Sequence, residues 1–576
     1  MVGIMSTKKA IKGIECRFAT HIRKSYQNPM DVHLIKEIVH YEDGTIEPKL
    51  KLIKDYKRPF WVTKKNKQKY QDKKEWSRIS DLDQYEVTQS DLTKKIQQVL
   101  KVPGRPKGLK ELSDSPYLYG AEITSTALIK ARYQQQWPEL NTEYSVAAID
   151  TETLAVPGDS GPIFIVTVAY KNENLTCAWA DWLVGHKALN LRDRKEIDLA
   201  FKDRVRDLLG DKINQEKGDT VELYIGDSII DIIRHAFDWV HKRMPDVLAL
   251  WNQAFDIPKF IECIEAAGVD PKEIFSDPKL PEHLRYFNWR PGRTKEVTAS
   301  GKVKPINPAQ QWHNCDTTSS FTILDAMCVY RRLRLAQQED SKTSLDYILK
   351  KELKSQKLKF PPADKYQGLD WHIHMRENYP LEYMCYALYD VRGMLELDAK
   401  TKDLAISFPV DLGTTDFSQG ASQTRKLLNA LHFFCLEEGY VIGTTPTYNE
   451  EKAKSQVNTL SLDGWIVILP AHLMRNEGEH VLEDVPSVGT SLRLLVADLD
   501  CVSSYPSNGL ALNISKTTCK TELVDIKGLR EGVFRLQNIN LTQGHVNAIE
   551  YCTTMFGMMS MKELSEYYDK KLDNTI

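Results

Sequence analysis

Several apolar segments of this chain carry carboxylate side chains at or near their ends, and this pattern constrains the fold more than any other feature. The segment YSVAAIDTET holds Asp150 and Glu152, and the apolar run VLALWN shortly precedes Asp256. A long amphipathic segment further along contains Asp390. One carboxylate beside a strand carries little information, because such residues are common in turns. Several in different elements favour a fold that brings distant segments to one point.

The hydrophobic pattern predicts an α/β fold with a mixed sheet. Three consecutive β-rich segments predict an antiparallel meander, at 144–153, 161–170 and 175–184. Isoleucines and other apolar residues then recur at helical spacing over 229–240, with Asp227 or Ser228 as the cap of that helix. A buried strand at 247–252 and an amphipathic helix at 380–402 complete this part.

The spacing of the acids suits metal-dependent hydrolysis. Asp150 and Glu152 lie two apart on a predicted strand, so both side chains project from one face. Tyr386 and Asp390 lie four apart on a predicted helix, hence also on one face. Two divalent ions roughly 4 Å apart can activate a water and stabilise a leaving oxygen in phosphodiester hydrolysis. Magnesium prefers oxygen ligands, which these acids supply.

Each piece also has a plain structural explanation. A DxE pair arises often by chance, and Asn252 with Asp256 fits an ordinary turn at a strand end. A tyrosine such as Tyr386 is commonly a half-buried core residue, and an aspartate such as Asp390 a surface acid. The joint appearance of these residues, in order and in matching contexts, favours the functional interpretation.

The segments AIDTET, NQAFD and YALYD resemble the three exonuclease motifs of family B DNA polymerases. The resemblance implies a ribonuclease-H-like exonuclease domain in which a tyrosine helps to place the attacking water, here Tyr386. It also implies DNA contacts by Asn252 and Phe255. In many members the motif aspartate stands five positions after the asparagine, whereas here Asp256 stands four positions after Asn252, which weakens the role of Asn252. The implied ligands of two Mg²⁺ ions, for which Mn²⁺ may substitute, are Asp150, Glu152, Asp256 and Asp390.

A second resemblance, to polymerase motif A, lies near the C-terminal end in DCVSSYPS. It implies a catalytic, metal-binding role for Asp500 and nucleotide binding by Ser503, Ser504 and Tyr505. Ser504 stands where leucine is usual. The later motifs KxxxNSxYG and DTD do not follow. We therefore expect this chain alone not to polymerise DNA, and expect a second chain to supply the fingers, the rest of the palm and the thumb.

These resemblances predict a four-part organisation. An α+β N-terminal domain at 1–140 would contact template or single strands, and an exonuclease domain would span 141–405. A connecting segment at 406–455 would pack on the N-terminal domain, and 456–576 would form a partial palm. Residues 50–74 hold ten Lys and Arg against two Asp, interleaved with aromatics. Such a mixture suits a stacked single strand, but equally a solvated surface with its aromatics in the core.

Composition sets the compartment that we expect. A formal net charge of −2 argues neither for nor against a polyanionic partner, and the ten cysteines form no CxxC pair, which fits a reducing cytoplasm. We find no signal peptide and no membrane span, so the expected place is the cytoplasm of a phage-infected bacterium. The expected partners are DNA, the second polymerase chain, a sliding clamp and other replisome proteins. Two alternatives to the split polymerase remain. The chain could be a non-catalytic DNA-binding or scaffold subunit, or a truncated piece of a whole polymerase.

Overall fold

The computed structural model divides the chain into two compact units, Met1–Gln456 and Val457–Ile576. It describes residues 9–444 except 27, 72, 298–301, 336, 338–339, 356, 359 and 364. In the second unit it describes only short strands: β19 (Val481–Val485), β20 (Thr490–Arg493), β21 (Cys519–Leu523), β22 (Gln537–Leu541) and β23 (Gly544–Asn547). The β19–β20 pair and the β21–β22–β23 sheet are antiparallel.

An eight-stranded mixed sheet forms the centre of the first unit, with the strand order β11-β10-β9-β8-β12-β17-β16-β13. The predicted meander is present, because β8, β9 and β10 pair antiparallel in sequence order. Strand β12 then joins β8 in parallel, and β17 joins β12 in parallel. The strands are β8 (Val146–Thr153), β9 (Ile163–Tyr170), β10 (Glu173–Trp179), β11 (Thr220–Gly226), β12 (Val247–Leu250), β13 (Phe287–Arg290), β16 (Asn314–Thr317) and β17 (Thr322–Asp325).

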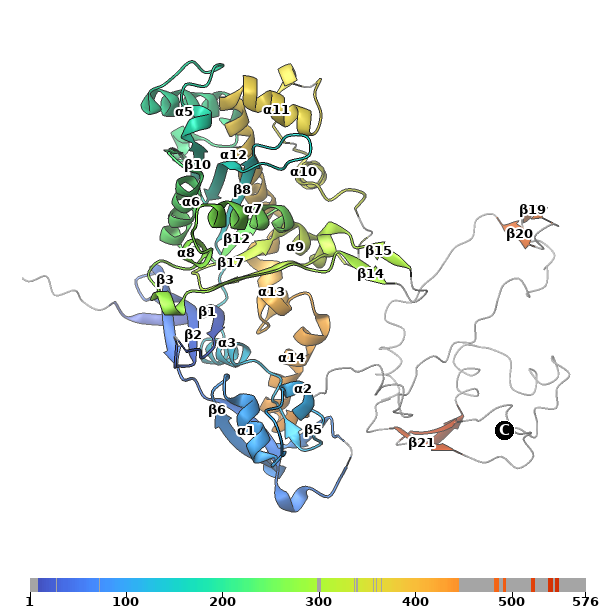
Figure 1. Ribbon diagram of the computed structural model, residues 1–576. Helices are drawn as coiled ribbons and strands as arrows, with labels where there is room; N and C mark the ends of the chain where they lie inside the picture. The colour runs from blue at the N-terminus through green and yellow to red at the C-terminus, as the bar shows by residue number, and fades with distance from the viewer. Residues whose placement is uncertain are drawn as a thin grey trace, which may run out of the picture. The chain divides into compact units, whose positions relative to one another are not determined.

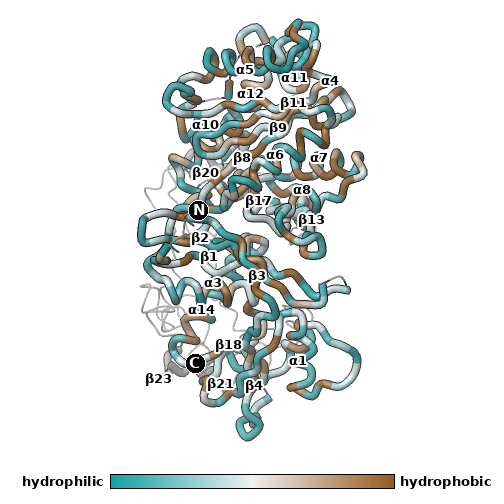
Figure 2. Tube along the Cα trace, turned by 90° about the vertical axis from the view of Figure 1, so that its left-hand side faces the viewer, coloured by the Kyte–Doolittle hydropathy of each residue, from teal (hydrophilic) through white to brown (hydrophobic). Residues whose placement is uncertain are grey.

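Helices cover both faces of this sheet, as expected for an α/β fold (Figure 1). One face packs on α5 (Arg194–Leu209), α9 (Ala326–Leu333), α10 (Leu345–Leu353) and α12 (Pro380–Thr401). The other packs on α6 (Ile229–Arg243), α7 (Gln253–Ala266) and α8 (Lys272–Phe275). Ser228 caps α6, as one of the two predicted residues. Figure 2 shows the apolar strands of the sheet lying between these helices.

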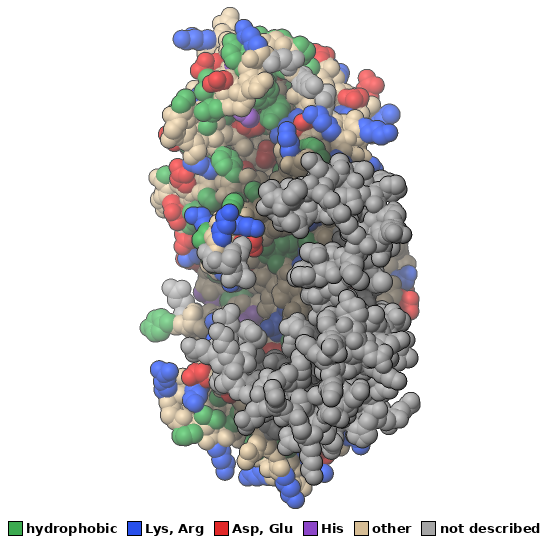
Figure 3. All heavy atoms as spheres, turned by 90° about the vertical axis from the view of Figure 1, so that its right-hand side faces the viewer, with side chains coloured by type: hydrophobic (Ala, Val, Ile, Leu, Met, Phe, Trp, Pro, Cys, Tyr) green, Lys and Arg blue, Asp and Glu red, His purple; other side chains and the backbone are tan. Residues whose placement is uncertain are grey.

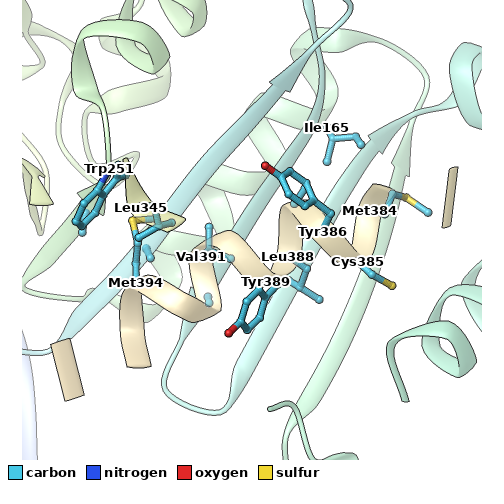
Figure 4. Packing of buried hydrophobic residues seen from close by; sticks show 14 of the residues in the cluster. Ile165, Trp251, Leu345, Met384, Cys385, Tyr386, Leu388, Tyr389, Val391 and Met394 are labelled. Atoms are coloured by element: carbon cyan, nitrogen blue, oxygen red, sulfur yellow. The ribbon is translucent and has the colours of Figure 1, made fainter. Parts of the chain in front are cut away.

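Helix α12 is the longest helix of the described residues and lies against the centre of the sheet. Its buried side chains pack among residues of β9, α10 and the turn after β12, as Figure 4 shows for Ile165, Leu345 and Trp251. Apolar residues occur nearly all round the helix between Leu381 and Leu397, and most of them are buried. A helix that is apolar on all sides belongs in a core, so α12 is fixed firmly enough to hold polar groups in place.

The N-terminal residues form two smaller sheets. One is the antiparallel set β1 (Ile11–Ile22), β2 (Val32–Tyr41) and β3 (Ile46–Lys54), on which α3 (Ser125–Gln136) packs. The other has the order β6-β4-β7, with β4 (Arg58–Thr63), β6 (Leu82–Val87) and β7 (Leu118–Tyr119). The short helices α1 (Leu92–Val99) and α2 (Leu109–Leu112) lie beside it.

The chain returns to the N-terminal region after the large sheet. Helices α13 (Phe408–Leu412) and α14 (Gln423–Glu437) lead to β18 (Tyr440–Ile442), which pairs antiparallel with β5 (Trp76–Arg78). The remaining short elements are α4 (Ala180–Leu183), α11 (Leu369–Asn378) and the hairpin of β14 (Lys295–Val297) and β15 (Val303–Pro305).

The strand predicted over 175–184 is wrong at its C-terminal end. Strand β10 stops at Trp179, and the short helix α4 follows it.

Aromatic residues of the basic segment 50–74 lie in the core. Phe60 and Trp61 on β4 are buried, and the Tyr70 hydroxyl forms hydrogen bonds with Thr63 and Tyr119. The rings of Phe60 and Trp61 are therefore not free to stack on bases, which favours the structural interpretation for these two residues. Basic and acidic side chains are interspersed on the face that Figure 3 shows. Among the described residues, no helix is long and apolar enough to cross a membrane.

Candidate metal centre

The strand β8 organises the candidate site because its successive side chains point to opposite faces of the sheet. Ala148 belongs to the core on the α12 side, and Ile149 belongs to the core on the α7 side. By the same alternation, Asp150 and Glu152 project toward α12, and Thr151 projects toward α7. This one strand therefore presents polar side chains of the site on both faces of the sheet.

Asp390 completes a group of three acids. One carboxylate oxygen from each of Asp150, Glu152 and Asp390 lies within 4.8 Å of the others. Glu152 and Asp390 are buried, and Asp150 is partly exposed. Burial raises the pKa of Asp150 well above its ordinary value, and the charges of Asp256, Asp390 and Glu152 raise it further. Like charges held this close disfavour full ionisation, so a cation would relieve the repulsion.

Lys357 lies among these acids. Its ammonium pairs with Asp390 Oδ2 and donates a hydrogen bond of 3.0 Å to the Tyr386 hydroxyl. Burial nevertheless keeps the pKa of Asp390 above its ordinary value, while the Lys357 charge acts in the opposite direction. The other oxygen of Asp390, Oδ1, is buried and makes no hydrogen bond to the described residues. That oxygen remains available to a ligand.

Glu152 is held by a second tyrosine of α12. Tyr383 donates a hydrogen bond of 2.6 Å to Glu152 Oε2, and His372 Nδ1 lies 2.7 Å from the Tyr383 hydroxyl. His372 comes from α11, whose Trp371 also packs against Tyr386 with ring centroids 4.8 Å apart. Burial, and then the Glu152 charge, raise the pKa of Tyr383 well above its ordinary value. The hydroxyl is therefore protonated and able to donate.

Asp256 approaches the strand from the α7 face. The Thr151 hydroxyl donates a hydrogen bond of 2.7 Å to Asp256 Oδ1. Asp256 is not one of the three acids within 4.8 Å, although its charge is the largest of the neighbouring charges that raise the pKa of Asp150. Burial raises the pKa of Asp256 itself. Asp256 therefore lies beside the acid group and is linked to β8 by the hydrogen bond from Thr151, the residue between Asp150 and Glu152.

The start of α7, where Asp256 lies, is fixed by another buried acid. Asp325, at the end of β17, caps α9 by accepting from the Cys328 amide at 2.9 Å, and it also accepts from the Gln253 amide at 3.0 Å. These two bonds join the first turns of α7 and α9 to the same strand end. They set the position from which Asp256 reaches toward β8.

The other predicted residues lie apart from these contacts or outside the described residues. Asn252 stands exposed at the start of α7 without a side-chain capping bond, and Phe255 is 42% exposed. Both side chains are therefore open to a ligand but have no described contact with the acids. The four predicted residues Asp500, Ser503, Ser504 and Tyr505 lie outside the described residues.

The acid group fits a hard divalent cation. Mg²⁺ takes oxygen ligands, commonly from one or two carboxylates together with water. Three acids converge here, and Asp390 Oδ1 accepts no hydrogen bond from the residues that the structure describes. The Lys357 ammonium already offsets part of the negative charge. This arrangement accommodates a cation without needing any ligand from sulfur or imidazole.

Comparison with known proteins gives one weak relationship. A stretch of 240 aligned residues is 25% identical to a DNA-directed DNA polymerase of Escherichia phage RB69. The match takes in 39% of this chain and 23% of that polymerase. The chain thus corresponds to about a quarter of the length of this relative. No family model matches the chain. The match supports a relationship with DNA polymerases.

Sequence reasoning did not identify Lys357, Tyr383 or His372 as site residues. Lys357 lies in the lysine-rich stretch KKELKSQKLKF, in which no spacing rule distinguishes it from the other lysines. Tyr383 lies one helical turn before Tyr386, so its place on the same face of the helix was a usable signal. His372 belongs to a separate helix, and no spacing rule connects it with the acids.

Proposed function

We propose that this chain is related to the N-terminal part of a family B DNA polymerase and carries a magnesium-dependent 3′→5′ exonuclease. The observation that carries the proposal is the convergence of Asp150, Glu152 and Asp390, from a strand and a helix 240 positions apart in the sequence, within 4.8 Å. The mixed sheet and its helices agree with a ribonuclease-H-like domain. The similarity to a phage DNA-directed DNA polymerase supports DNA as the substrate.

In this proposal the three acids and Asp256 hold two Mg²⁺ ions, with Mn²⁺ as a substitute. Bound divalent ions would supply an activated water and stabilise the leaving 3′ oxygen. The Tyr386 hydroxyl, held by Lys357, would orient the attacking water through a hydrogen bond. Lys357 would also offset negative charge beside the scissile phosphate. Asn252 and Phe255, exposed on α7, would contact the terminal nucleotides of the strand.

A nuclease assay tests this proposal directly. The full chain, with a 5′-labelled single strand and Mg²⁺, should shorten the strand from its 3′ end, and EDTA should stop the reaction. Asp150→Ala combined with Glu152→Ala should abolish cleavage, and Asp390→Asn should reduce it by orders of magnitude. Persistence of cleavage in both variants would remove the proposed site from the reaction.

The matched control is Asp398→Asn. Asp398 lies two helical turns after Asp390 on α12, is also buried, and accepts a hydrogen bond of 2.6 Å from the Leu404 amide. An asparagine can still accept that bond, and Asp398 is outside the acid group. Cleavage should therefore survive in this variant. The alternative of a non-catalytic DNA-binding subunit predicts strand binding without any shortening in the unmodified protein.

For polymerisation we propose that Asp500, with Ser503, Ser504 and Tyr505 beside it, contributes to a site completed by a second chain carrying the fingers, the rest of the palm and the thumb. The likeness of DCVSSYPS to motif A supports this. Co-expression with such a chain should give a complex that extends a primer. Extension that survives Asp500→Ala would contradict the assignment.

A further inference from the structure

We propose that Tyr383 and His372 are positioning residues that hold Glu152 in the orientation required to bind a divalent cation. The inference rests on the proposed function, because it concerns the same acid group. It gives α11, which carries His372, and the first turn of α12, which carries Tyr383, a role in orienting a metal ligand.

The hydrogen bonds have only one consistent direction. The Glu152 carboxylate can only accept when ionised, so the Tyr383 hydroxyl donates to Oε2 over 2.6 Å. That hydroxyl has a single proton, so at 2.7 Å from His372 it must accept there. His372 therefore carries a hydrogen on Nδ1, and the same nitrogen lies 3.6 Å from Glu152 Oε2. The donors run from His372 through Tyr383 to Glu152, and each bond polarises the next.

The surroundings hold this chain of bonds in place. Tyr383 is 1% exposed and stacks on Phe164 of β9 with ring centroids 6.0 Å apart. Its ring also lies edge-on to Trp371, with centroids 6.0 Å apart. His372 is partly exposed and touches the edge of the same tyrosine. A ring fixed by a strand and two helices can hold one carboxylate oxygen and leave the other free for a ligand.

The hydrogen bond from Tyr383 to Glu152 is of a kind that affects metal affinity. Partners that orient a ligating carboxylate or imidazole typically change metal affinity by about 10- to 100-fold when they are removed. Lys357 plays a corresponding part for Asp390. Among the described residues, no side chain donates a hydrogen bond to Asp150. Tyr383 is thus the neutral donor of the acid group, and its removal should change cation binding without changing net charge.

The experiment measures Mn²⁺ binding to the full chain by titration calorimetry, without DNA. Tyr383→Phe keeps the ring and removes only the hydroxyl, and should weaken Mn²⁺ binding by about tenfold or more. The matched control is Tyr330→Phe, because Tyr330 is also buried and donates a 2.5 Å hydrogen bond to Glu352, outside the acid group. That variant should bind Mn²⁺ as the unmodified protein does. Equal or tighter binding in Tyr383→Phe would overturn the inference.

His372→Phe tests whether His372 acts through Tyr383. It should weaken binding less than Tyr383→Phe, and the double variant should bind no worse than Tyr383→Phe alone, since effects along one chain of bonds do not add. Additive losses would show that His372 acts on Glu152 independently, and would overturn the relay. Because His372 is partly exposed, this variant still tests whether His372 supports Mn²⁺ binding if Tyr383→Phe does not fold.

Failure of the inference can be distinguished from failure of the proposed function. If the unmodified chain binds no Mn²⁺, or binds it equally well after Asp150→Ala with Glu152→Ala, the metal centre itself is refuted. If the unmodified chain binds Mn²⁺ through those acids and Tyr383→Phe binds it unchanged, only the positioning role is refuted.

Discussion

A buried ion pair between the N-terminal sheet and the large sheet gives a prediction about stability. The Lys36 side chain on β2 is fully buried, and its ammonium lies 2.7 Å from Asp246 Oδ1. It also donates to the carbonyl oxygens of Met244 and Pro245, at 2.8 and 2.6 Å. Burial lowers the pKa of Lys36 to about 8, so it is charged at neutral pH.

Lys36→Met should therefore cost about 3 kcal/mol of unfolding free energy. Removing one partner of a buried ion pair usually costs about 3–5 kcal/mol, because the other charge stays buried without compensation. Asp246 would keep the two hydrogen bonds that Ser145 donates to it, and the Arg17 guanidinium would still lie 3.6 Å away. The loss of unfolding free energy should therefore lie at the lower end of that range. Methionine is of similar length, so little packing is lost.

Urea-induced unfolding, followed by far-ultraviolet circular dichroism, measures this loss. The matched control is Lys49→Met on the neighbouring strand β3, because Lys49 pairs with Glu47 and their side chains are 43% and 54% exposed. An exposed pair contributes about 0–1 kcal/mol. Adding Asp246→Asn to Lys36→Met should restore part of the loss. If Lys36→Met costs no more than Lys49→Met, the reasoning about the buried pair is refuted.

Three further predictions concern folding stability and not metal binding. Gly161→Ala should destabilise by more than Gly158→Ala, because both glycines have positive φ but only at Gly161 would a Cβ meet a backbone oxygen, at 2.2 Å; equal unfolding free energies would contradict this. Leu388→Ala, at a fully buried site on α12, should cost about 2–5 kcal/mol in urea unfolding, and a loss below about 1 kcal/mol would show that the site collapses. Burial, with the nearby His21, lowers the pKa of His33 from 6.5 to about 4, so the unfolded chain binds more protons between these values and stability falls as pH falls through this window. His33→Gln should reduce the stability lost between pH 7 and pH 5 by about 2 kcal/mol, and an unchanged pH dependence of urea unfolding would contradict the assignment.

The sequence predicted those elements whose pattern is long and regular. The strands β8 and β9 and the helices α6 and α12 follow from runs of alternating or helically spaced apolar residues. The last four strands of the sheet in chain order were harder, since β12, β13, β16 and β17 have four residues each. A four-residue strand contains too few alternations to distinguish it from a turn or a buried helical segment. Only β12 was predicted, because its residues are all apolar.

The acids of the site could be predicted, but the groups that hold them could not. Asp150 and Glu152 share a face by strand geometry, and Asp390 shares one with Tyr386 by helix geometry, so local spacing is sufficient. Lys357 reaches Asp390 across 33 positions of sequence, through a loop after α10. His372 reaches Tyr383 from a separate helix. Such contacts depend on how helices pack, which no local period encodes.

The alternation of β8 explains why the fourth acid stands apart from the other three. Asp150 and Glu152 face α12, whereas Thr151 between them faces α7 and donates to Asp256. Asp256 therefore reaches the site from the opposite side of the strand, with its helix fixed by Asp325. A single-residue shift in the pairing of β8 with β9 would exchange the two faces and send both acids toward α7. The register in which Asp150 lies opposite Thr167 is thus a condition of the site as much as the acids themselves.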